Sequence, residues 1–272
     1  MIVCKSPAEI EKMRAANQVV ARILEELAAM VAPGVSTADL DAAAESRVRA
    51  AGAEPAFKGY RGYPATLCAS VNEQVVHGIP SPTPLKSGDI VSLDMGVKLN
   101  GYYGDSAVTV PVGTIAPQAA ELLRVTEESL FRGIDAVKPG ARVSDIGAAV
   151  QQHVEAHGLS VVREFVGHGI GTSLHEEPQI ANYGPGGRGP RLSEGMVLAI
   201  EPMVNLGKAG VKVLSDGWTA VTRDGSLSAH FEHTVVVTPE GCEILTLLET
   251  DAGRARQLMA GGRVLAPAPV RS

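Results

Sequence analysis

Apolar residues recur along the chain with two spacings, and the order of these spacings predicts where helices and strands lie. A helical spacing of three and four residues begins at Pro7, directly after an N-cap serine, and runs to the Pro33-Gly34 pair. A second helical segment covers residues 39–51 and ends at Gly52. Runs rich in β-branched residues then predict strands at residues 65–71, 89–97 and 106–112.

The second part of the chain repeats this order of elements. Two helical segments precede three strand-like runs, and these lie at residues 117–136, 144–157, 160–168, 195–204 and 233–238. Pro139-Gly140 lies 106 residues after Pro33-Gly34, and Glu201 lies 107 residues after Asp94. Matches in helices, turns and strands, in the same order, indicate a duplication.

A duplicated sequence of this kind predicts an α+β fold made of two α/β halves related by a pseudo-twofold axis. The antiparallel sheets would face each other inside, and the helices would cover them outside. We expect one domain over residues 1–248, with halves at about 1–110 and 111–248. The remaining residues, 249–272, are rich in small residues and proline, so we expect a flexible tail there.

An Asn100-Gly101 pair between two strand-like runs predicts a β-hairpin, because a type I′ turn needs positive φ at both central residues. In the resulting register Asp94 faces Ala107 and Asp105 faces Gly96. The two aspartates then point to the same face as diagonal neighbours, about 7–8 Å apart. Gly96 is expected to leave open space beside Asp105. Two carboxylates so placed could bind one or two cations, although a solvent-exposed sheet face is the simpler alternative.

The duplication groups the remaining polar candidates around this hairpin. The second half offers His168, Glu201 and Glu232, and the first half adds His77. We expect the His-Gly-Ile segments at His77 and His168 to occupy equivalent positions in the two halves. Two inward-facing sheets would bring these groups together at the axis. Four carboxylates in a dry cleft stay protonated or bind cations, and their charge balances two divalent ions. Oxygen and imidazole ligands suit Mn²⁺, Fe²⁺, Co²⁺ or Zn²⁺.

Composition and charge narrow the class of protein further. The 272 residues are 45% hydrophobic and 20% charged, as in an ordinary globular protein, and the net charge of −6 argues against a nucleic-acid-binding role. Three widely spaced cysteines suit a reducing compartment. The N-terminus becomes charged too early for a signal peptide, and no stretch reaches the length of a membrane span. These features predict a cytoplasmic protein without a membrane partner.

Several motifs together resemble the type I methionine aminopeptidases of metallopeptidase family M24. They are HGIP at His77, VGHGIG at His168, LHEEP at His175, AIEP at Glu201 and FEHT at Glu232, with Asp94 and Asp105. The resemblance covers residues 1 to about 248. The Asp-Asp-His-Glu-Glu set is specific for the wider creatinase-like, "pita-bread" fold. The short spacing from His175 to Glu201, and the start at SPAEIEKMR, resemble the short bacterial form.

The resemblance implies a role for each matching residue. Asp94 would chelate one metal ion, Asp105 and Glu232 would bridge both ions, and His168 and Glu201 would complete the ligands of the other ion. Glu201 would also carry the proton from the attacking water to the departing amine. His175 would hydrogen-bond the scissile carbonyl. His77 would contact the backbone of the second residue of the substrate or assist proton transfer.

The resemblance also implies a narrow apolar pocket for a methionine side chain. The matching wall residues are Tyr60, Tyr63, Cys68 and Trp218, and Cys68 is a wall rather than a nucleophile. Leu174 stands where family members commonly have phenylalanine, which puts the breadth of specificity at the first residue in doubt.

The implied activity is removal of N-terminal methionine from nascent polypeptides with a small second residue, by a monomer, with the ribosome as a candidate partner. Three alternatives stay open: a prolidase or Xaa-Pro aminopeptidase of the same fold, a relative without metal chemistry, and a calcium-binding module. The scatter of ligands over distant strands disfavours the last, because dedicated calcium loops gather oxygens locally.

Overall fold

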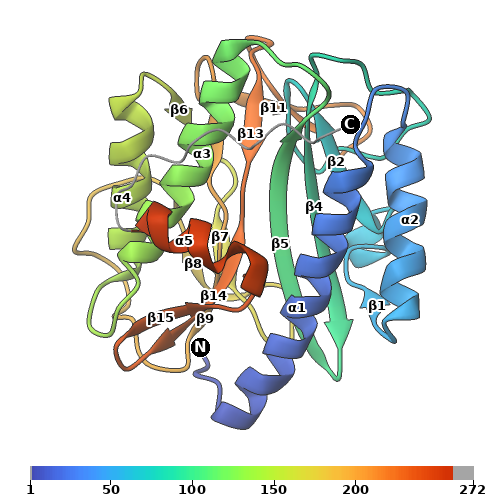
Figure 1. Ribbon diagram of the computed structural model, residues 1–272. Helices are drawn as coiled ribbons and strands as arrows, with labels where there is room; N and C mark the ends of the chain where they lie inside the picture. Colours follow the sequence, from blue (N-terminus) through green and yellow to red (C-terminus); the bar gives the residue numbers. More distant parts are fainter. Residues whose placement is uncertain (1, 260–272) are drawn as a thin grey trace.

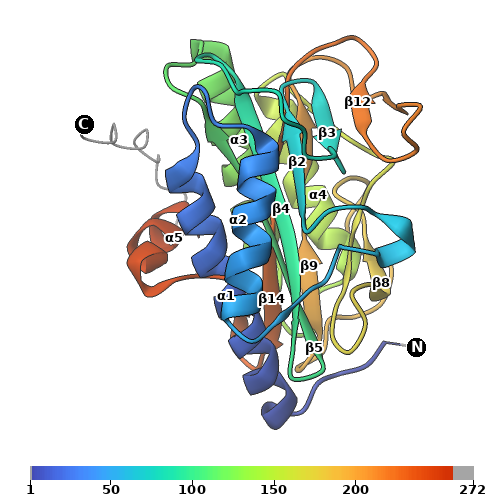
Figure 2. The same ribbon diagram turned by 90° about the vertical axis from the view of Figure 1, so that its right-hand side faces the viewer.

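The computed structural model describes residues 2–259 as two halves packed side by side (Figure 1). Helices α1 (Pro7–Met30) and α2 (Thr37–Ala50) flank the strands on one side, and α3 (Pro117–Asp135) and α4 (Val143–Ala156) flank them on the other. Figure 2 shows α1 and α2 on the outer side of the first sheet. The expected arrangement of inner antiparallel sheets and outer helices is therefore confirmed.

Capping boxes define the starts of both helices of the first half: the N-cap at Ser6 is confirmed, whereas α2 begins two residues before its expected start at residue 39. At the start of α1 the Glu9 carboxylate accepts hydrogen bonds from the Ser6 backbone and hydroxyl, and Pro7 fills the first helical position. Ser36 and Asp39 form the equivalent capping box at the start of α2. Each helix buries an apolar face against the first sheet, which removes that surface from water and fixes the helix position.

The first sheet is built around the hairpin that the sequence predicts. Strand β4 (Ile90–Leu99) pairs with β5 (Tyr102–Pro111), and it also pairs with β2 (Leu67–Val71) and β1 (Glu54–Pro55). The register places Asp94 opposite Ala107 and Asp105 opposite Gly96, as expected. Asn100 and Gly101 have φ of 52° and 83°, as a type I′ turn requires.

The second half contains a five-stranded antiparallel sheet covered by α3 and α4. Its strands, in spatial order, are β15 (Gly241–Ile244), β14 (His233–Thr238), β9 (Val197–Ile200), β7 (Gly167–Gly169) and β8 (Glu176–Ile180). The largest buried apolar cluster lies between this sheet and the two helices. The second sheet therefore has the same outer helical cover as the first.

Hydrogen bonds join the two halves where β5 runs beside the segment that precedes β14. The backbone N–H of Glu232 donates to Ala107, and the Ser106 hydroxyl donates to the Glu232 carbonyl at 2.6 Å. The Thr234 hydroxyl donates to the Asp105 carbonyl at 2.8 Å. The contact fixes Asp105 next to Glu232, although the two residues come from different halves.

Backbone geometry supports the internal duplication. Gly34 and its counterpart Gly140 have φ of 95° and 84°, and Gly52 and its counterpart Gly158 have φ of 70° and 73°. These values lie in the left-handed region, where glycine avoids the penalty that a Cβ brings. The repeated glycines therefore mark turns of the same shape in both halves.

Two of the expected strands are interrupted. The run at 160–168 divides into β6 (Ser160–Val161) and β7, and the run at 195–204 divides into β9 and β10 (Met203–Asn205). The second break lies at Glu201-Pro202, where proline has no N–H for the strand ladder. Glu201 therefore directly follows a strand, whereas its counterpart Asp94 lies within one.

Two small sheets complete the strand structure. Strand β10 pairs with β6 and β13 (Ser228–His230). Strand β12 (Ala220–Thr222) pairs with β3 (Gln74–Val76) and β11 (Val211–Val213). A 3₁₀ turn, η1 (Tyr60–Gly62), follows β1 along the chain. These elements carry several residues of the pocket described below.

The flexible tail expected from residue 249 onward is wrong for its first part. A 3₁₀ turn, η2 (Glu249–Asp251), leads into helix α5 (Ala252–Met259), which packs against α3 (Figure 1). Ala255 and Leu258 are buried in the core of the second half, because their spacing places them on one helical face. The rest of the expected tail, residues 260–272, lies outside the described residues. Within the described part of the chain, no helix is both long and apolar enough to cross a membrane.

Candidate metal centre and substrate pocket

One pocket of about 170 Å³ contains every residue that the sequence singles out as a candidate for chemistry or binding. Residues from both halves line it, and most come from strands or from the segments that follow them. The lining residues are Phe57, Tyr60, Arg61, Tyr63, Cys68, Val76, His77, Asp94, Asp105, His168, Leu174, His175, Glu201, Trp218 and Glu232.

The hairpin places its two aspartates in this pocket, and both are more than nine-tenths buried. The open space expected at Gly96 is absent. A Cβ at Gly96 would lie 2.8 Å from the Phe57 ring, so that ring fills the space opposite Asp105. Gly96 therefore makes room for an aromatic wall of the pocket.

Asp105, His168 and Glu232 form a compact group of metal-ligand type, with one ligand atom of each within 4.8 Å of the others. The Nε2 atom of His168 lies 3.8 Å from Asp105 Oδ2 and 3.5 Å from Glu201 Oε1. Nδ1 of His168 donates to the Gly169 carbonyl at 2.9 Å, which can only accept. A neutral His168 therefore carries its lone pair on Nε2, facing the carboxylates.

The electrostatics of this cluster favour a cation. Burial raises the pKa of Asp94 to about 7, and it raises the pKa values of Asp105, Glu201 and Glu232 well above their ordinary range. Neighbouring carboxylates add to the shift for the last three. Asp105 Oδ1 and Glu232 Oε1 are buried and have no hydrogen-bond partner in the part of the chain that the structure describes. Divalent cations would supply the missing partner and allow these acids to ionise, so the residues fit a metal centre.

His175 and His77 line the same pocket as the carboxylates. His175 hydrogen-bonds the Tyr60 hydroxyl at 2.9 Å through Nδ1, and its ring centroid is 4.2 Å from that of His168. His77 packs edge-on against Trp218. Burial lowers the pKa of His77 to about 4 and also lowers that of His175, so both imidazoles are neutral at pH 7.

The expected equivalence of His77 and His168 is wrong. His168 lies on β7, within the five-stranded sheet and opposite Ala199 of β9. His77 follows β3, which pairs with β12 in a separate small sheet, and it has a φ of 60°. The similar sequences around the two histidines therefore do not indicate equivalent structural positions in the two halves.

An apolar wall closes the side of the pocket next to Asp94. Cys68 lies opposite Asp94 on β2, and burial raises its thiol pKa well above the ordinary value, which keeps the thiol protonated. Tyr63 packs edge-on against Trp218 with ring centroids 5.1 Å apart. Its hydroxyl donates to the Leu67 and Gly78 carbonyls. Leu174 is buried in the same cluster, so this wall presents mainly apolar surface.

The sequence reasoning missed His230, which lies behind the carboxylates. Its Nε2 is 3.8 Å from Glu201 Oε2, and neither ring nitrogen has a hydrogen-bond partner among the described residues. Burial, and to a smaller extent His77, lower its pKa to about 3. His230 precedes Glu232 by two residues, and strand alternation could have placed the two on one side. Phe57 and Arg61 also line the pocket without having been singled out.

Comparisons with known proteins agree with this geometry. The family model described as metallopeptidase family M24 matches residues 11–239. Methionine aminopeptidase 1 of Bacillus subtilis is 56% identical over 246 residues, which cover 90% of this chain and 99% of that protein. The crystal structure of methionine aminopeptidase from Thermotoga maritima has a TM-score of 0.90 at 49% identity, over 91% of this chain and 100% of that one.

A more distant structural neighbour shares the fold alone. Prolidase from Pyrococcus furiosus has a TM-score of 0.74 at 24% identity, over 91% of this chain and 66% of that one. The pita-bread fold is therefore shared by proteins named for different activities, and the fold by itself does not distinguish between these activities. The chain belongs to metallopeptidase family M24 and, within it, to the type I methionine aminopeptidases.

Proposed function

We propose that this protein is a metal-dependent aminopeptidase that removes the N-terminal methionine of nascent polypeptides whose second residue is small. One observation carries the proposal: both halves contribute buried carboxylates to a pocket whose other wall is apolar and aromatic. The printed names of the curated relatives support the choice of methionine. The preference for a small second residue rests on the family resemblance.

In this proposal the centre holds two divalent ions, drawn from Mn²⁺, Fe²⁺, Co²⁺ and Zn²⁺. Asp94 would hold one ion, Asp105 and Glu232 would contribute to both, and His168 and Glu201 would complete the ligands of the other. When bound, the ions supply Lewis acidity that polarises a carbonyl and lowers the pKa of water. The unpartnered oxygens of Asp105 and Glu232 support this ligand assignment.

The protein's own residues position the substrate and move a proton. Glu201 takes a proton from the attacking water and passes it to the departing amine, as general base and then general acid. In the tautomer that accepts the Tyr60 hydroxyl hydrogen at His175 Nδ1, 2.9 Å away, Nε2 carries the ring hydrogen and can donate it to the scissile carbonyl oxygen. His77 contacts the backbone of the second substrate residue.

The methionine side chain is proposed to lie against the apolar wall. Tyr60, Tyr63, Cys68, Leu174 and Trp218 provide a narrow surface of aromatic rings, a thiol and a leucine, which suits an unbranched, polarizable thioether. The protonated Cys68 thiol acts as a wall. Burial of the side chain there would place the first peptide bond beside the carboxylates.

We further propose that the protein works in the cytoplasm as a monomer, on chains that emerge from the ribosome. Its three cysteines are free thiols, which supports a reducing compartment. Residues 1–248 would form the catalytic domain as two halves at about 1–110 and 111–248. Helix α5 then adds packing to the second half.

A peptide panel with each metal added back tests the function. Chelated protein is reconstituted with Mn²⁺, Fe²⁺, Co²⁺ or Zn²⁺ and assayed on Met-Ala-Ser, on Met-Xaa peptides with larger second residues, and on Xaa-Pro peptides. We expect metal-dependent release of methionine from Met-Ala-Ser, with less release as the second residue grows. Cleavage of Xaa-Pro peptides while Met-Ala-Ser stays intact would contradict the proposal and favour a prolidase-type activity.

A further inference from the structure

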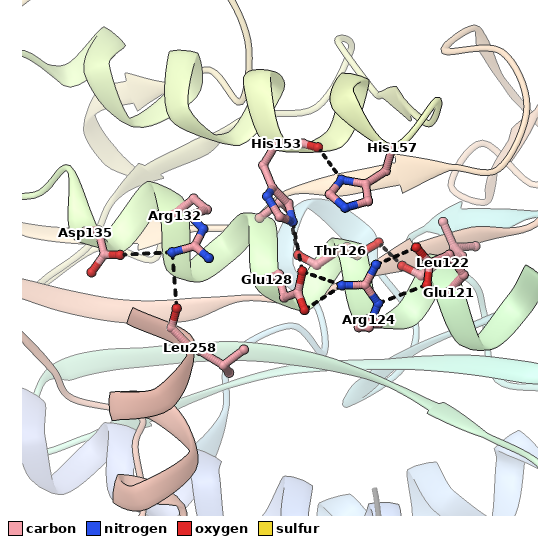
Figure 3. Close-up of polar contacts among 11 residues, drawn as sticks. Glu121, Leu122, Arg124, Thr126, Glu128, Arg132, Asp135, His153, His157 and Leu258 are labelled. Carbon is pink, nitrogen blue, oxygen red and sulfur yellow. Dashed lines mark hydrogen bonds and ion pairs between the residues drawn. The ribbon is translucent and has the colours of Figure 1, made fainter. Parts of the chain in front are cut away.

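A second cluster of metal-ligand type lies outside the pocket, between the two outer helices of the second half (Figure 3). Glu128 comes from α3, His153 comes from α4, and His157 is the C-cap residue of α4. One ligand atom of each residue lies within 4.8 Å of the others. None of the three lines the pocket that holds the candidate catalytic residues.

The spacing of the three groups suits a small metal ion. His153 and His157 are four residues apart, so they project from the same face on successive turns, and their ring centroids are 4.6 Å apart. His153 Nε2 lies 3.1 Å from Glu128 Oε2. Neighbouring ligand atoms on a tetrahedral zinc ion are about 3.3 Å apart, given bonds of about 2.0–2.1 Å. The His153–Glu128 pair is therefore already close to this separation.

The backbone sets the tautomer of His157. Its Nδ1 lies 2.8 Å from the His153 carbonyl oxygen, which can only accept a hydrogen bond, so Nδ1 carries the hydrogen. The lone pair of the neutral ring is then on Nε2. Histidines that ligate metals commonly donate their other ring N–H to a backbone carbonyl in this way. For His153, coordination through Nε2 requires the tautomer with hydrogen on Nδ1.

Arg124 is the competitor for the Glu128 carboxylate. Its Nη1 lies 2.7 Å from both Glu128 oxygens (Figure 3). The same guanidinium makes two further hydrogen bonds to Glu121, at 2.9 and 2.5 Å. Arg124 would therefore keep a carboxylate partner when Glu128 turns toward a cation. Its positive charge should weaken cation binding without abolishing it.

We propose that Glu128, His153 and His157 bind one divalent ion of the zinc class, which ties α3 to the C-terminal end of α4. Two imidazoles and one carboxylate favour Zn²⁺, Ni²⁺ or Cu²⁺ over Mg²⁺ and Ca²⁺, which prefer oxygen ligands. Water completes the coordination, because His157 is exposed. The site is independent of the proposed aminopeptidase activity.

Equilibrium dialysis against Zn²⁺ at pH 7.5, followed by metal analysis, tests the proposal. The wild-type protein should bind one more zinc per chain than His157→Ala, and His153→Ala should match His157→Ala. Gln152→Ala, an exposed change on the same helix, serves as the control and should keep the wild-type number. Equal numbers in the wild type and both histidine variants would overturn the proposal, as would an equal loss in Gln152→Ala.

Two further variants test the assigned roles of the acid and the arginine. Glu128→Gln should lower the affinity of the proposed site for zinc by at least about tenfold. This factor is the lower end of the loss in metal affinity seen when groups around a metal are removed. Arg124→Gln should tighten it, because a competing cation is removed. Both variants should retain wild-type turnover of Met-Ala-Ser with catalytic metal present. If Glu128→Gln binds zinc as tightly as the wild type, only the two histidines bind the ion, and the three-ligand proposal is contradicted.

Discussion

Lys5 Nζ lies 2.6 Å from Glu176 Oε2, and this ion pair connects the N-terminal segment to the turn that carries His175. The Glu176 carboxylate also accepts the Ser173 backbone N–H at 3.1 Å. A Cβ at Gly171 would lie 2.4 Å from Lys5 Cε, so glycine there makes room for the pair. Since Glu176 directly follows His175, the ion pair should fix the position of that imidazole in the pocket.

The first prediction concerns this connection. Lys5→Met should lower kcat toward Met-Ala-Ser by roughly tenfold to a hundredfold, because a shift of about 1 Å in a catalytic group can have an effect of that size. It should also lower the free energy of unfolding by about 1–3 kcal/mol, since the partly buried Glu176 carboxylate loses its partner. Steady-state kinetics and denaturant unfolding measure the two effects.

Arg124→Met provides the matched control for Lys5→Met. It removes a cation from the buried carboxylate of Glu128, which lies outside the pocket. It should destabilise the fold and leave kcat close to that of the wild type. If both variants lose stability and neither loses activity, the ion pair of Lys5 is structural only.

The second prediction concerns the close packing of α1 on β5. A Cβ at Gly104 would lie 2.8 Å from the Asn17 backbone nitrogen, and Asn17 Oδ1 accepts the Asp105 N–H at 3.3 Å. Gly104→Ala should push the helix away and destabilise the protein by about 1–3 kcal/mol. Gly253→Ala, where a Cβ meets open space on a helix, is the control. Equal stability of the two variants in denaturant unfolding would contradict this packing.

The third prediction concerns His230. Its neutral ring can donate a hydrogen bond toward Glu201, which favours the ionised carboxylate that a metal requires. His230→Leu should weaken Mn²⁺ binding at the catalytic centre by roughly tenfold, whereas His230→Gln keeps a donor and should weaken it less. Isothermal titration calorimetry compares the three proteins. If His230→Leu and His230→Gln lower the Mn²⁺ affinity equally, the shape of the His230 side chain and not its hydrogen-bond donor supports metal binding.

The fourth prediction concerns pH and metal removal. Burial raises the pKa of Asp94 to about 7 in the folded protein, while the unfolded chain loses that proton near its ordinary pKa of 3.8. Between about pH 4 and 7 the unfolded state therefore binds fewer protons, and the free energy of unfolding of metal-free protein falls as pH rises. Asp105, Glu201 and Glu232 act in the same direction.

Bound metal replaces the protons on these four acids. The free energy of unfolding of metal-loaded protein should therefore not fall between about pH 4 and 7. The stabilisation by Mn²⁺ should therefore be larger at pH 7.5 than at pH 5, by a few kcal/mol. Urea unfolding with chelator and with Mn²⁺ at each pH measures the difference, and exposed groups contribute equally to both forms. Parallel stability curves would mean that the four acids do not exchange protons for metal.

Local patterns were enough to predict the hairpin and the duplication. Asn100-Gly101 fixed the register that places Asp94 and Asp105 on one face, and the repeated glycines correspond to turns with matching φ. These features depend on backbone geometry over a few residues, and the types of those residues determine that geometry locally. The helices of both halves were predictable for the same reason, because their caps and apolar faces are local.

The features that the sequence did not predict correctly depend on contacts between segments far apart in the chain. His77 resembles His168 in its neighbours, yet the two lie in different sheets, since strand pairing and not letter similarity decides equivalence. The space at Gly96 is filled by Phe57, which comes from another loop. The proximity of His230 to Glu201 likewise exists only once β13 pairs with β10, the strand that follows Glu201.

The most direct test of the account is a crystal structure of the protein grown with Mn²⁺, with anomalous data collected at the manganese edge. The account predicts two anomalous peaks, about 3.5–4 Å apart, among the side chains of Asp94, Asp105, His168, Glu201 and Glu232. Density for an ordered protein with these five side chains apart, or with no manganese peak between them, would contradict it.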